Sequence, residues 1–281
     1  MPSSQPVVVG IVSDLHSGST VALCPPEVKL DDGGYYRASK PQEWLWENWG
    51  DFWARVRSVQ RQHKAKLVQV FNGDLTEGDH HKTTQILSGN PTAQAAVVNE
   101  VMKTPLALKP DAMFFVRGTE AHVGPSAAYE ERVAMGLWKD KRPVVLEEGT
   151  GNASHWNVKM DIQGVRLDFA HHGKYGSRPS TKMNVINALA CDIFTEHVTE
   201  NRPYPHIAVR SHCHQYADTH DAYPTRLIQT PAWQLKTAFI HRINTTGKLS
   251  HIGGIILVIK DGKLDVTPVL YRPDSPKAWK P

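Results

Sequence analysis

The 281-residue sequence predicts an α/β fold, and three features of the chain support that prediction. Short apolar runs end in polar or charged residues, as buried strands do when their carboxyl ends carry functional groups. Segments with helical periodicity separate these runs, which is the pattern of βαβ units. In the second half, short strand-like segments and a hairpin signal replace this alternation. No internal repeat or linker divides the chain, so we expect one domain over residues 1–281.

The first half is expected to contain three buried strands, two long helices and two long loops. The strands cover residues 7–12, 66–72 and 112–116. The spacing of apolar residues predicts helices over 41–62 and over 92–101, the second ending before Pro105. The stretches 24–40 and 78–90 are expected to be surface loops.

The second half is expected to be rich in strands. Residues 156–162 and 165–170 flank Gln163-Gly164 and predict a hairpin. A helix follows over 181–198, and further strands are expected at 206–210, 225–229, 254–260 and 264–269. We expect the segment 220–281 to complete a second sheet. Its only candidate substrate contacts are His241 and Asn244.

The composition limits the cellular setting and the class of partner. With 32 Lys and Arg against 28 Asp and Glu, the net charge of +4 permits a polyanionic partner without demanding one. The three cysteines cannot form a full disulfide framework and are expected to be free thiols in a reducing compartment. The N-terminus carries no basic leader, and no apolar stretch approaches the ~18 residues of a membrane span. We therefore expect a cytoplasmic protein with no membrane partner.

The 15 histidines are the unusual feature of the composition, and several of them follow predicted strands. The strand-end motifs are Asp14-Leu15-His16, Gly73-Asp74, Gly118-Thr119-Glu120-Ala121-His122, His171-His172 and His212-Cys213-His214. Strand ends are where α/β sheets place ligands, and carboxylate oxygens with imidazole nitrogens suit Zn, Mn or Fe. Six candidate ligands are too many for one four-coordinate ion and suit two ions that share a carboxylate.

Each of these pieces is weak when taken alone. A strand-end aspartate often caps a turn, and a single histidine there is more often a hydrogen-bonded surface residue than a ligand. The order of five such pieces, each after a predicted strand, favours a metal site over those alternatives.

In that order the motifs resemble those of the calcineurin-like metallophosphoesterases, a family of phosphatases, phosphodiesterases and repair-type nucleases. The family pattern is Asp-x-His, Gly-Asp, Gly-Asn-His, a strand-end His and Gly-His-x-His. The corresponding residues here span the chain from residue 7 to residue 214. The resemblance implies a four-layer α-β-β-α sandwich with two mixed sheets.

The resemblance also implies a dinuclear metal centre. Asp14, His16 and His214 would hold one ion, His212 and either His171 or His172 would hold the second, and Asp74 would bridge them. Family members differ in which residue of the histidine pair binds, so both stay open. Manganese is the favoured metal, with zinc, iron, nickel or cobalt as alternatives.

The chain departs from the family pattern most at residues 118–122, where Gly-Asn-His would stand. Thr119 takes the position of the asparagine, but its neutral hydroxyl is a poor ligand, so Glu120 or a water could complete the second metal site. The histidine comes two residues later, as His122, and reaches the site only if the extra residues bulge outward. A smaller departure is Ser211, which replaces a glycine.

The expected activity is hydrolysis of a phosphate ester by a hydroxide that bridges two ions, with His122 as the catalytic group that protonates the leaving oxygen. The candidate substrate-binding residues are Arg117, His80, His81 and Lys174. The basic balance and the long loops favour a phosphodiester in DNA, RNA or a nucleotide. Tyr35, Tyr36 and tryptophans between 44 and 53 could stack bases, although core packing suits these tryptophans better. The alternatives are a phosphomonoesterase acting on a small metabolite or phosphoprotein, and a catalytically degenerate metal-binding scaffold.

Overall fold

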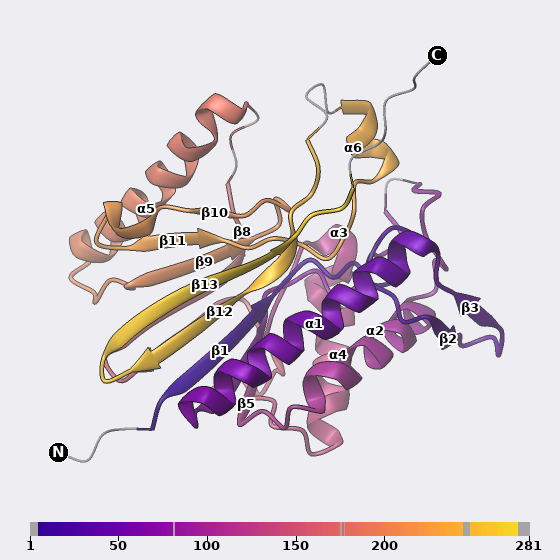
Figure 1. Ribbon diagram of the computed structural model, residues 1–281, viewed down its shortest axis with the longest axis horizontal. Helices are drawn as coiled ribbons and strands as arrows, with labels where there is room; N and C mark the ends of the chain where they lie inside the picture. Colours follow the sequence, from indigo (N-terminus) through magenta and orange to yellow (C-terminus); the bar gives the residue numbers. More distant parts are fainter. Residues whose placement is uncertain (1–4, 81, 175, 177, 244–247, 275–281) are drawn as a thin grey trace.

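Two mixed β-sheets lie face to face at the centre of the computed structural model, which describes residues 5–80, 82–174, 176, 178–243 and 248–274 (Figure 1). The first sheet has the strand order β13-β12-β1-β4-β5-β6. Its strands are β1 (Val7–Val12), β4 (Lys66–Phe71), β5 (Ala112–Val116), β6 (Ser154–His155), β12 (Ile252–Lys260) and β13 (Lys263–Tyr271). The second sheet has the order β10-β11-β9-β8-β7. Its strands are β7 (Val158–Ile162), β8 (Val165–His172), β9 (Ile207–Ser211), β10 (Ala217–Asp218) and β11 (Arg226–Gln229).

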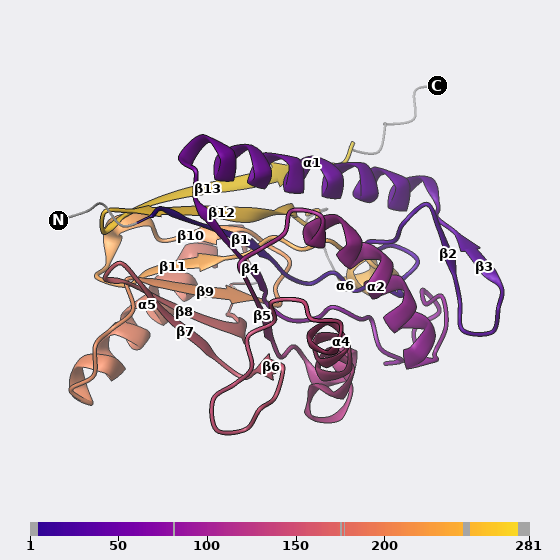
Figure 2. The same ribbon diagram turned by 90° about the horizontal axis from the view of Figure 1, so that it is seen from below.

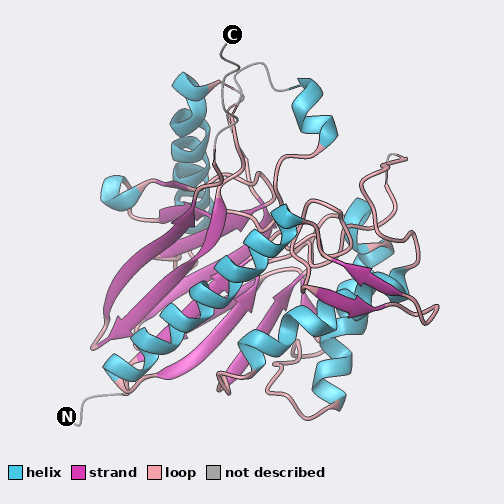
Figure 3. Ribbon diagram, turned by 45° about the vertical axis from the view of Figure 1, so that its right-hand side comes forward, coloured by secondary structure: helices cyan, strands magenta, loops and turns pink. Residues whose placement is uncertain are grey.

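Helices cover the outer faces of both sheets (Figure 2). On the first sheet lie α1 (Lys40–His63), α2 (Pro91–Leu106) and α4 (Ala128–Lys139), and on the second lies α5 (Lys182–Thr199). The short helices are α3 (Glu120–Val123), α6 (Ala238–Ile243) and the 3-10 turns Pro125–Ala127, Pro179–Thr181 and His220–Ala222. A hairpin of β2 (Glu27–Lys29) and β3 (Tyr35–Arg37) lies apart from both sheets (Figure 3). No helix in the described ranges is long and apolar enough to cross a membrane.

Apolar side chains fill the space between the two sheets. Val9 and Ile11 of β1 belong to the same buried cluster as Leu167 and Phe169 of β8. Further buried clusters lie between each sheet and the helices that cover it. The expected four-layer α-β-β-α sandwich with two mixed sheets is therefore confirmed, and most predicted strands and helices are present near their expected bounds.

The expectation that the segment 220–281 completes the second sheet is wrong for most of that segment. β11 pairs with β9 in the second sheet, whereas β12 pairs with β1 and extends the first sheet. Eight successive residues of β12 are buried, which is the pattern of a strand covered on both faces. β12 therefore lies inside the first sheet, and β13 forms its edge.

The expected end of the second helix before Pro105 is also wrong, because α2 continues to Leu106. Proline has no N–H, so the carbonyl of Val101 loses its helical hydrogen bond. The indole Nε1 of Trp49 on α1 donates to that carbonyl at 3.3 Å. A neighbouring helix thus replaces the missing bond.

Several elements were not expected from the sequence, among them the short β6, β10 and α6. The loop 24–40 contains the β2–β3 hairpin, and α3 forms within the altered motif after β5. The sequence also did not predict α4, whose inward residues Val133, Ala134 and Leu137 have helical spacing but are few among charged neighbours. α4 bears directly on the site, because two of its carboxyl groups bind backbone N–H groups at strand ends.

An aromatic cluster anchors α1 to the first sheet. Trp49 meets Trp233 and Trp53 edge to face, with ring centres 4.8 and 5.5 Å apart, and Phe52 packs beside Trp53 at 5.2 Å. The backbone N–H of Trp233 donates to the carbonyl of Asp14 at 2.9 Å, so this core also holds the end of β1. Trp49 and Trp53 therefore pack in the core and offer no stacking surface to a substrate.

Phe52→Ala should lower the free energy of unfolding by about 3 to 5 kcal/mol, because it removes a fully buried ring and leaves a cavity. Phe239→Ala is the matched control: Phe239 is 59% exposed, so its loss should change stability by less than about 0.5 kcal/mol. Urea denaturation followed by circular dichroism measures both variants. Equal effects in the two variants would contradict the role of the cluster.

Candidate metal centre

Aspartate and histidine side chains from both sheets meet where the parallel strands end. Asp14 and His16 follow β1, Asp74 follows β4, and His212 and His214 follow β9. All five residues have positive φ angles, between 45° and 73°. This conformation costs about 1–2 kcal/mol per residue outside glycine, and such strain clusters at functional sites. The surrounding packing therefore holds these side chains in turns that the chain would not adopt freely.

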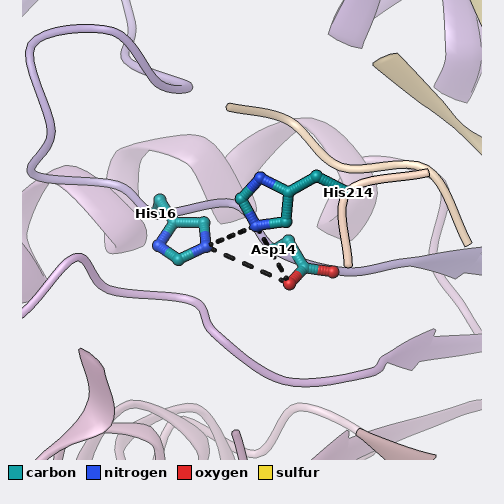
Figure 4. Close-up of side chains that lie close together, drawn as sticks. All are labelled: Asp14, His16 and His214. Atoms are coloured by element: carbon teal, nitrogen blue, oxygen red, sulfur yellow. Dashed lines mark hydrogen bonds and ion pairs between the residues drawn. The ribbon is translucent and has the colours of Figure 1, made fainter. Parts of the chain in front are cut away.

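Asp14, His16 and His214 form one compact group (Figure 4). The Nε2 of His214 lies 3.4 Å from Oδ1 of Asp14 and 3.1 Å from Nε2 of His16. The Nδ1 of His16 faces the carboxylate of Glu77 at 2.9 Å, so the ring proton belongs on Nδ1 and the lone pair on Nε2. Two imidazole nitrogens and a carboxylate oxygen thus point toward one place, which is a donor set for a divalent transition metal.

Asp74 belongs to a second group with His171 and His212, and to a third with His16 and His122. The Oδ2 of Asp74 lies 3.0 Å from Nε2 of His171 and 3.9 Å from Nε2 of His16. Asp74 is therefore the carboxylate that adjoins the donor sets on both sides. A dinuclear centre requires such a shared ligand, because its two ions lie only about 3.5–4 Å apart.

Neighbouring loops hold the Asp74 carboxylate in position. Its Oδ1 accepts the backbone N–H of Thr119 at 2.7 Å. Gly118 lies directly against it, since a Cβ at Gly118 would come 2.2 Å from the same oxygen. The fully buried Glu130 of α4 accepts the N–H of Gly118 at 2.6 Å and that of Leu75 at 3.2 Å. Glu130 thus ties the loop after β4 to the loop after β5, and burial together with the charge of Asp74 raises its pKa to about 8.

The buried aspartates at the centre are ionised. Burial alone would raise the pKa of Asp14, but the hydrogen bond and charge of His214 and the charge of His171 lower it to about 2. Burial also opposes ionisation of Asp74, yet the charge and hydrogen bond of His171 hold its pKa far below the usual range. Burial alone would lower the pKa of His171, but Asp74 and Asp14 raise it to about 10. In the metal-free centre the two ionised aspartates are therefore paired with a protonated His171, whose place as the positive partner a metal ion would take.

The donor atoms fit a pair of divalent cations. Asp14 Oδ1, Asp74 Oδ2 and His171 Nε2 are buried and make no well-angled hydrogen bond within the described part of the chain. The Nδ1 of His171 lies 2.7 Å from the carbonyl oxygen of Asn72, which directs its Nε2 toward the carboxylates. A backbone carbonyl or carboxylate behind the imidazole is the usual support of a metal-binding histidine. The two carboxylate oxygens contact neighbouring histidines, 3.0 Å from Asp74 Oδ2 to His171 Nε2 and 3.4 Å from Asp14 Oδ1 to His214 Nε2, and a cation between these atoms would stabilise the buried carboxylates further.

The two members of the histidine pair lie in different surroundings. His171 is buried and faces Asp74, as described above. His172 is exposed, and its Nε2 is 3.5 Å from Oγ1 of Thr119. It belongs to none of the donor groups found among the described residues. The geometry therefore favours His171 as the ligand.

Of the residues in the altered motif, Thr119 lies at the centre and Glu120 lies at the surface. The Oγ1 of Thr119 lies 3.0 Å from Nδ1 of His212, on the side of the second donor group. Glu120 begins α3, is exposed and belongs to none of the donor groups of the described chain. The structure thus brings Thr119 to the centre and leaves Glu120 outside it.

His122 lies at the centre, on the short helix α3, although it comes two residues later than the histidine of the family pattern. One helical turn takes up the two extra residues, and the N–H of His122 donates to the carbonyl of Thr119 at 2.8 Å. The ring of His122 lies 4.5 Å from that of His16, and its Nδ1 lies 2.8 Å from the carbonyl oxygen of Glu77. Burial and the charge of His16 lower the pKa of His122 to about 4, so this imidazole is neutral near pH 7. The free protein therefore presents a neutral His122, whereas the expected role requires a protonated imidazole.

The expected substrate-binding residues are dispersed. His80 lies beside the centre, with its ring 4.3 Å from that of His122. Arg117 is buried and donates from Nε to Ser154 Oγ at 3.1 Å, so its side chain is directed toward β6. Lys174 is exposed in the loop after β8, and His241 is exposed on α6. His81 and Asn244 lie outside the described residues.

Two carboxylic acids at the centre received no role from the sequence. Glu77 is 2% exposed and contacts His16 and His80 through its carboxylate. Its position three residues after Asp74 is a usable signal once Asp74 is recognised as a ligand. Glu130 has no such signal, because its partners are backbone N–H groups of two distant loops.

No protein-family model matches the chain, and no curated protein sequence matches it. Among solved structures, a dimetal phosphatase from Danio rerio matches with 10% identity and a TM-score of 0.41, over 95% of this chain and 99% of that one. A hypothetical protein from Pyrococcus horikoshii matches with 8% identity and a TM-score of 0.42, over 95% and 89%. A 5'-nucleotidase from Candida albicans matches with 11% identity and a TM-score of 0.38, over 81% of this chain and 45% of that one. These similarities are distant and show no family for the chain.

His171→Ala should lower the number of tightly bound divalent ions from two to one, because it removes a buried ligand of the second donor group. His172→Ala is the adjacent control and should leave two ions bound, since His172 is exposed and outside the donor groups of the described residues. Metal analysis after Mn²⁺ loading and gel filtration measures both. Loss of an ion from the His172 variant alone would reverse the assignment.

The lowered pKa of His122 predicts a loss of stability in acid. Its folded-state pKa of about 4 lies below the ordinary value of 6.5, so the stability that neutral His122 contributes is present above pH 6.5 and is lost as the pH falls toward 4. Metal-free wild-type protein should therefore lose about 2 kcal/mol more than His122→Gln between pH 7 and pH 4.5. Urea titrations at both pH values test this, and parallel losses would contradict it.

Proposed function

We propose that the chain is a dinuclear metal-dependent phosphoesterase that hydrolyses phosphodiester bonds in nucleic acid or nucleotides. The observation that carries the proposal is the shared position of Asp74. Its carboxylate adjoins both His16 of the Asp14–His16–His214 group and His171 of the second group. The order of the motifs along the chain, which resembles that of metallophosphoesterases, supports the same chemistry.

The residues of this chain would do three things in that reaction. Asp14, His16 and His214 would hold one ion, His171 and His212 the other, and Asp74 both. When bound, two such ions lower the pKa of a water and offset the charge of the phosphate oxygens. The hydroxyl of Thr119, beside His212, would offer a hydrogen bond rather than a ligand carboxamide.

His122 is the residue that we propose acts on the proton of the reaction. Its Nδ1 is directed at the carbonyl oxygen of Glu77, so Nε2 is the nitrogen left for the substrate side. The imidazole is neutral in the free protein, as its pKa of about 4 requires. An anionic phosphate beside it would favour the imidazolium, so proton uptake would accompany substrate binding and prepare protonation of the leaving oxygen.

We propose a diester with a nucleobase as the substrate, because an exposed indole lies at the sheet edge that also carries Thr119. Trp156 follows β6 and is 53% exposed, and its ring centre lies 4.9 Å from the guanidinium carbon of Arg117. Arg117 immediately precedes Gly118, and β6 pairs with β5, so this ring lies at the same edge of the sheet as Thr119. An exposed indole supported by a guanidinium suits stacking against a base. Manganese is the proposed metal, and the mixture of carboxylates and imidazoles suits it as it suits zinc and iron.

The test is hydrolysis by metal-loaded protein of bis(p-nitrophenyl) phosphate and of p-nitrophenyl phosphate. The wild-type protein with Mn²⁺ should prefer the diester. His122→Ala should lower kcat about 100-fold or more while two ions stay bound. The substitution removes the proposed proton-transfer group but none of the residues proposed to hold the two ions. Asp74→Ala should lose both turnover and the ions, since it removes the shared ligand.

Preference for the monoester would replace the diesterase with a phosphomonoesterase. No turnover of either ester with Mn, Ni, Co, Zn or Fe would instead indicate a metal-binding scaffold. Full activity in either variant would contradict the proposed centre.

A further inference from the structure

The segment from Thr76 to Gly78 contacts both His16 and the helical turn that carries His122, although no motif marks it. The carboxylate of Glu77 is buried between two histidines, with Oε2 2.9 Å from Nδ1 of His16 and Oε1 3.2 Å from Nε2 of His80. Gln234 donates from Nε2 to Oε2 of Glu77 at 2.8 Å. The carboxylate is therefore held from both sides and faces the imidazole edge that is opposite Nε2 of His16.

The same segment also holds the helical turn that carries His122. Thr76 donates from Oγ1 to the carbonyl of His122 at 2.9 Å, and Nδ1 of His122 lies 2.8 Å from the carbonyl oxygen of Glu77. The backbone of Gly78 packs directly against this turn, because a Cβ at Gly78 would lie 2.5 Å from the carbonyl oxygen of Ala121. Its φ of +72° is also one that other residues rarely adopt.

We propose that residues 76–78 form a positioning clasp that orients His16 through the Glu77 side chain and His122 through the backbone. The inference rests on the proposed function for its catalytic consequence, while its effect on metal binding is independent of that function. The clasp touches no substrate. It acts through His16, a candidate ligand, and through His122, the proposed proton-transfer residue.

The clasp should have two separate effects, one on metal binding by His16 and one on the position of His122. An anion against Nδ1–H of His16 keeps the lone pair on Nε2 and makes that nitrogen a better donor. The contacts from Thr76, Glu77 and Gly78 fix α3 against the loop after β4, which compensates for the two residues by which His122 is displaced in the altered motif. A carboxylate change should therefore affect metal affinity, and a backbone change should affect turnover.

Glu77, His80 and His122 also lie close enough together to suggest a third ion. Both oxygens of Glu77 already have partners, Oε2 in His16 and Gln234 and Oε1 in His80. These contacts account for the cluster without a cation. A direct count of bound ions separates the two interpretations.

The first experiment measures Mn²⁺ affinity by isothermal titration calorimetry. Glu77→Ala should weaken one of two binding events by about 10- to 100-fold, and Glu77→Gln should weaken it less, because the amide keeps an acceptor for His16 but loses the charge. Glu148→Ala is the control, as Glu148 is an exposed glutamate outside the donor groups of the described residues, and it should bind as wild type does.

The second experiment compares two glycine variants with the same backbone angle. Gly78→Ala should lower turnover of bis(p-nitrophenyl) phosphate at least tenfold with two ions still bound, and should speed amide hydrogen exchange over residues 119–124. Gly151→Ala is the control, because Gly151 has the same φ of +72° but nothing within 4 Å of its Cβ position, and it should leave both unchanged. Should Gly78→Ala fail to fold, Thr76→Val removes the hydrogen bond to the His122 carbonyl and should give the same exchange pattern.

Unchanged Mn²⁺ affinity in Glu77→Ala, or unchanged exchange over 119–124 in Gly78→Ala and Thr76→Val, would overturn the clasp. A third bound ion that disappears in Glu77→Ala would make Glu77 a ligand and would also overturn it. If the wild-type protein hydrolyses no ester, the proposed function fails, but the affinity and exchange measurements still decide the clasp.

Discussion

The contact between Asp74 and His171 is the constraint on which the rest of the centre depends. It joins a carboxylate at the end of a first-sheet strand to an imidazole at the end of a second-sheet strand, with 3.0 Å between Oδ2 and Nε2. Both groups are buried, so neither can rely on water for its charge. The two sheets must therefore pack at one particular offset, and the apolar layer between them provides it through Val70 on one side and Phe169 on the other. The fold thus sets the geometry of the centre before any cation binds.

The motif at residues 118–122 departs from the metallophosphoesterase pattern that it resembles, and contacts elsewhere in the chain compensate for the departure. Where the family has an asparagine and then a histidine, this chain has Thr119 and, three residues later, His122. A single turn of helix absorbs the difference, and the contacts of Thr76 and Glu77 with His122 keep that turn against the loop after β4. Glu130 fixes the other end by binding the N–H of Gly118. The displaced histidine therefore reaches the centre through contacts that no short motif describes.

Much of the fold and the donor set could be predicted from the sequence, because their signals are local. The apolar runs that end at Asp14 and Asp74 marked both strands and candidate ligands, and the His-x-His spacing at 212–214 marked another candidate pair. What could not be predicted depends on contacts between distant segments. The Trp49 indole supports α2 past Pro105, β12 joins the first sheet beside β1, and His171 differs from His172 only in the direction that the end of β8 gives each ring. Local patterning contains none of this information.

The proposed place of Asp74 between two metal ions can be tested by a crystal structure of the Mn²⁺-loaded protein measured at the manganese absorption edge. We expect two anomalous peaks about 3.5–4 Å apart, one beside Asp14, His16 and His214 and one beside His171 and His212, with the Asp74 carboxylate touching both. A single peak, or two peaks of which Asp74 touches only one, would contradict it.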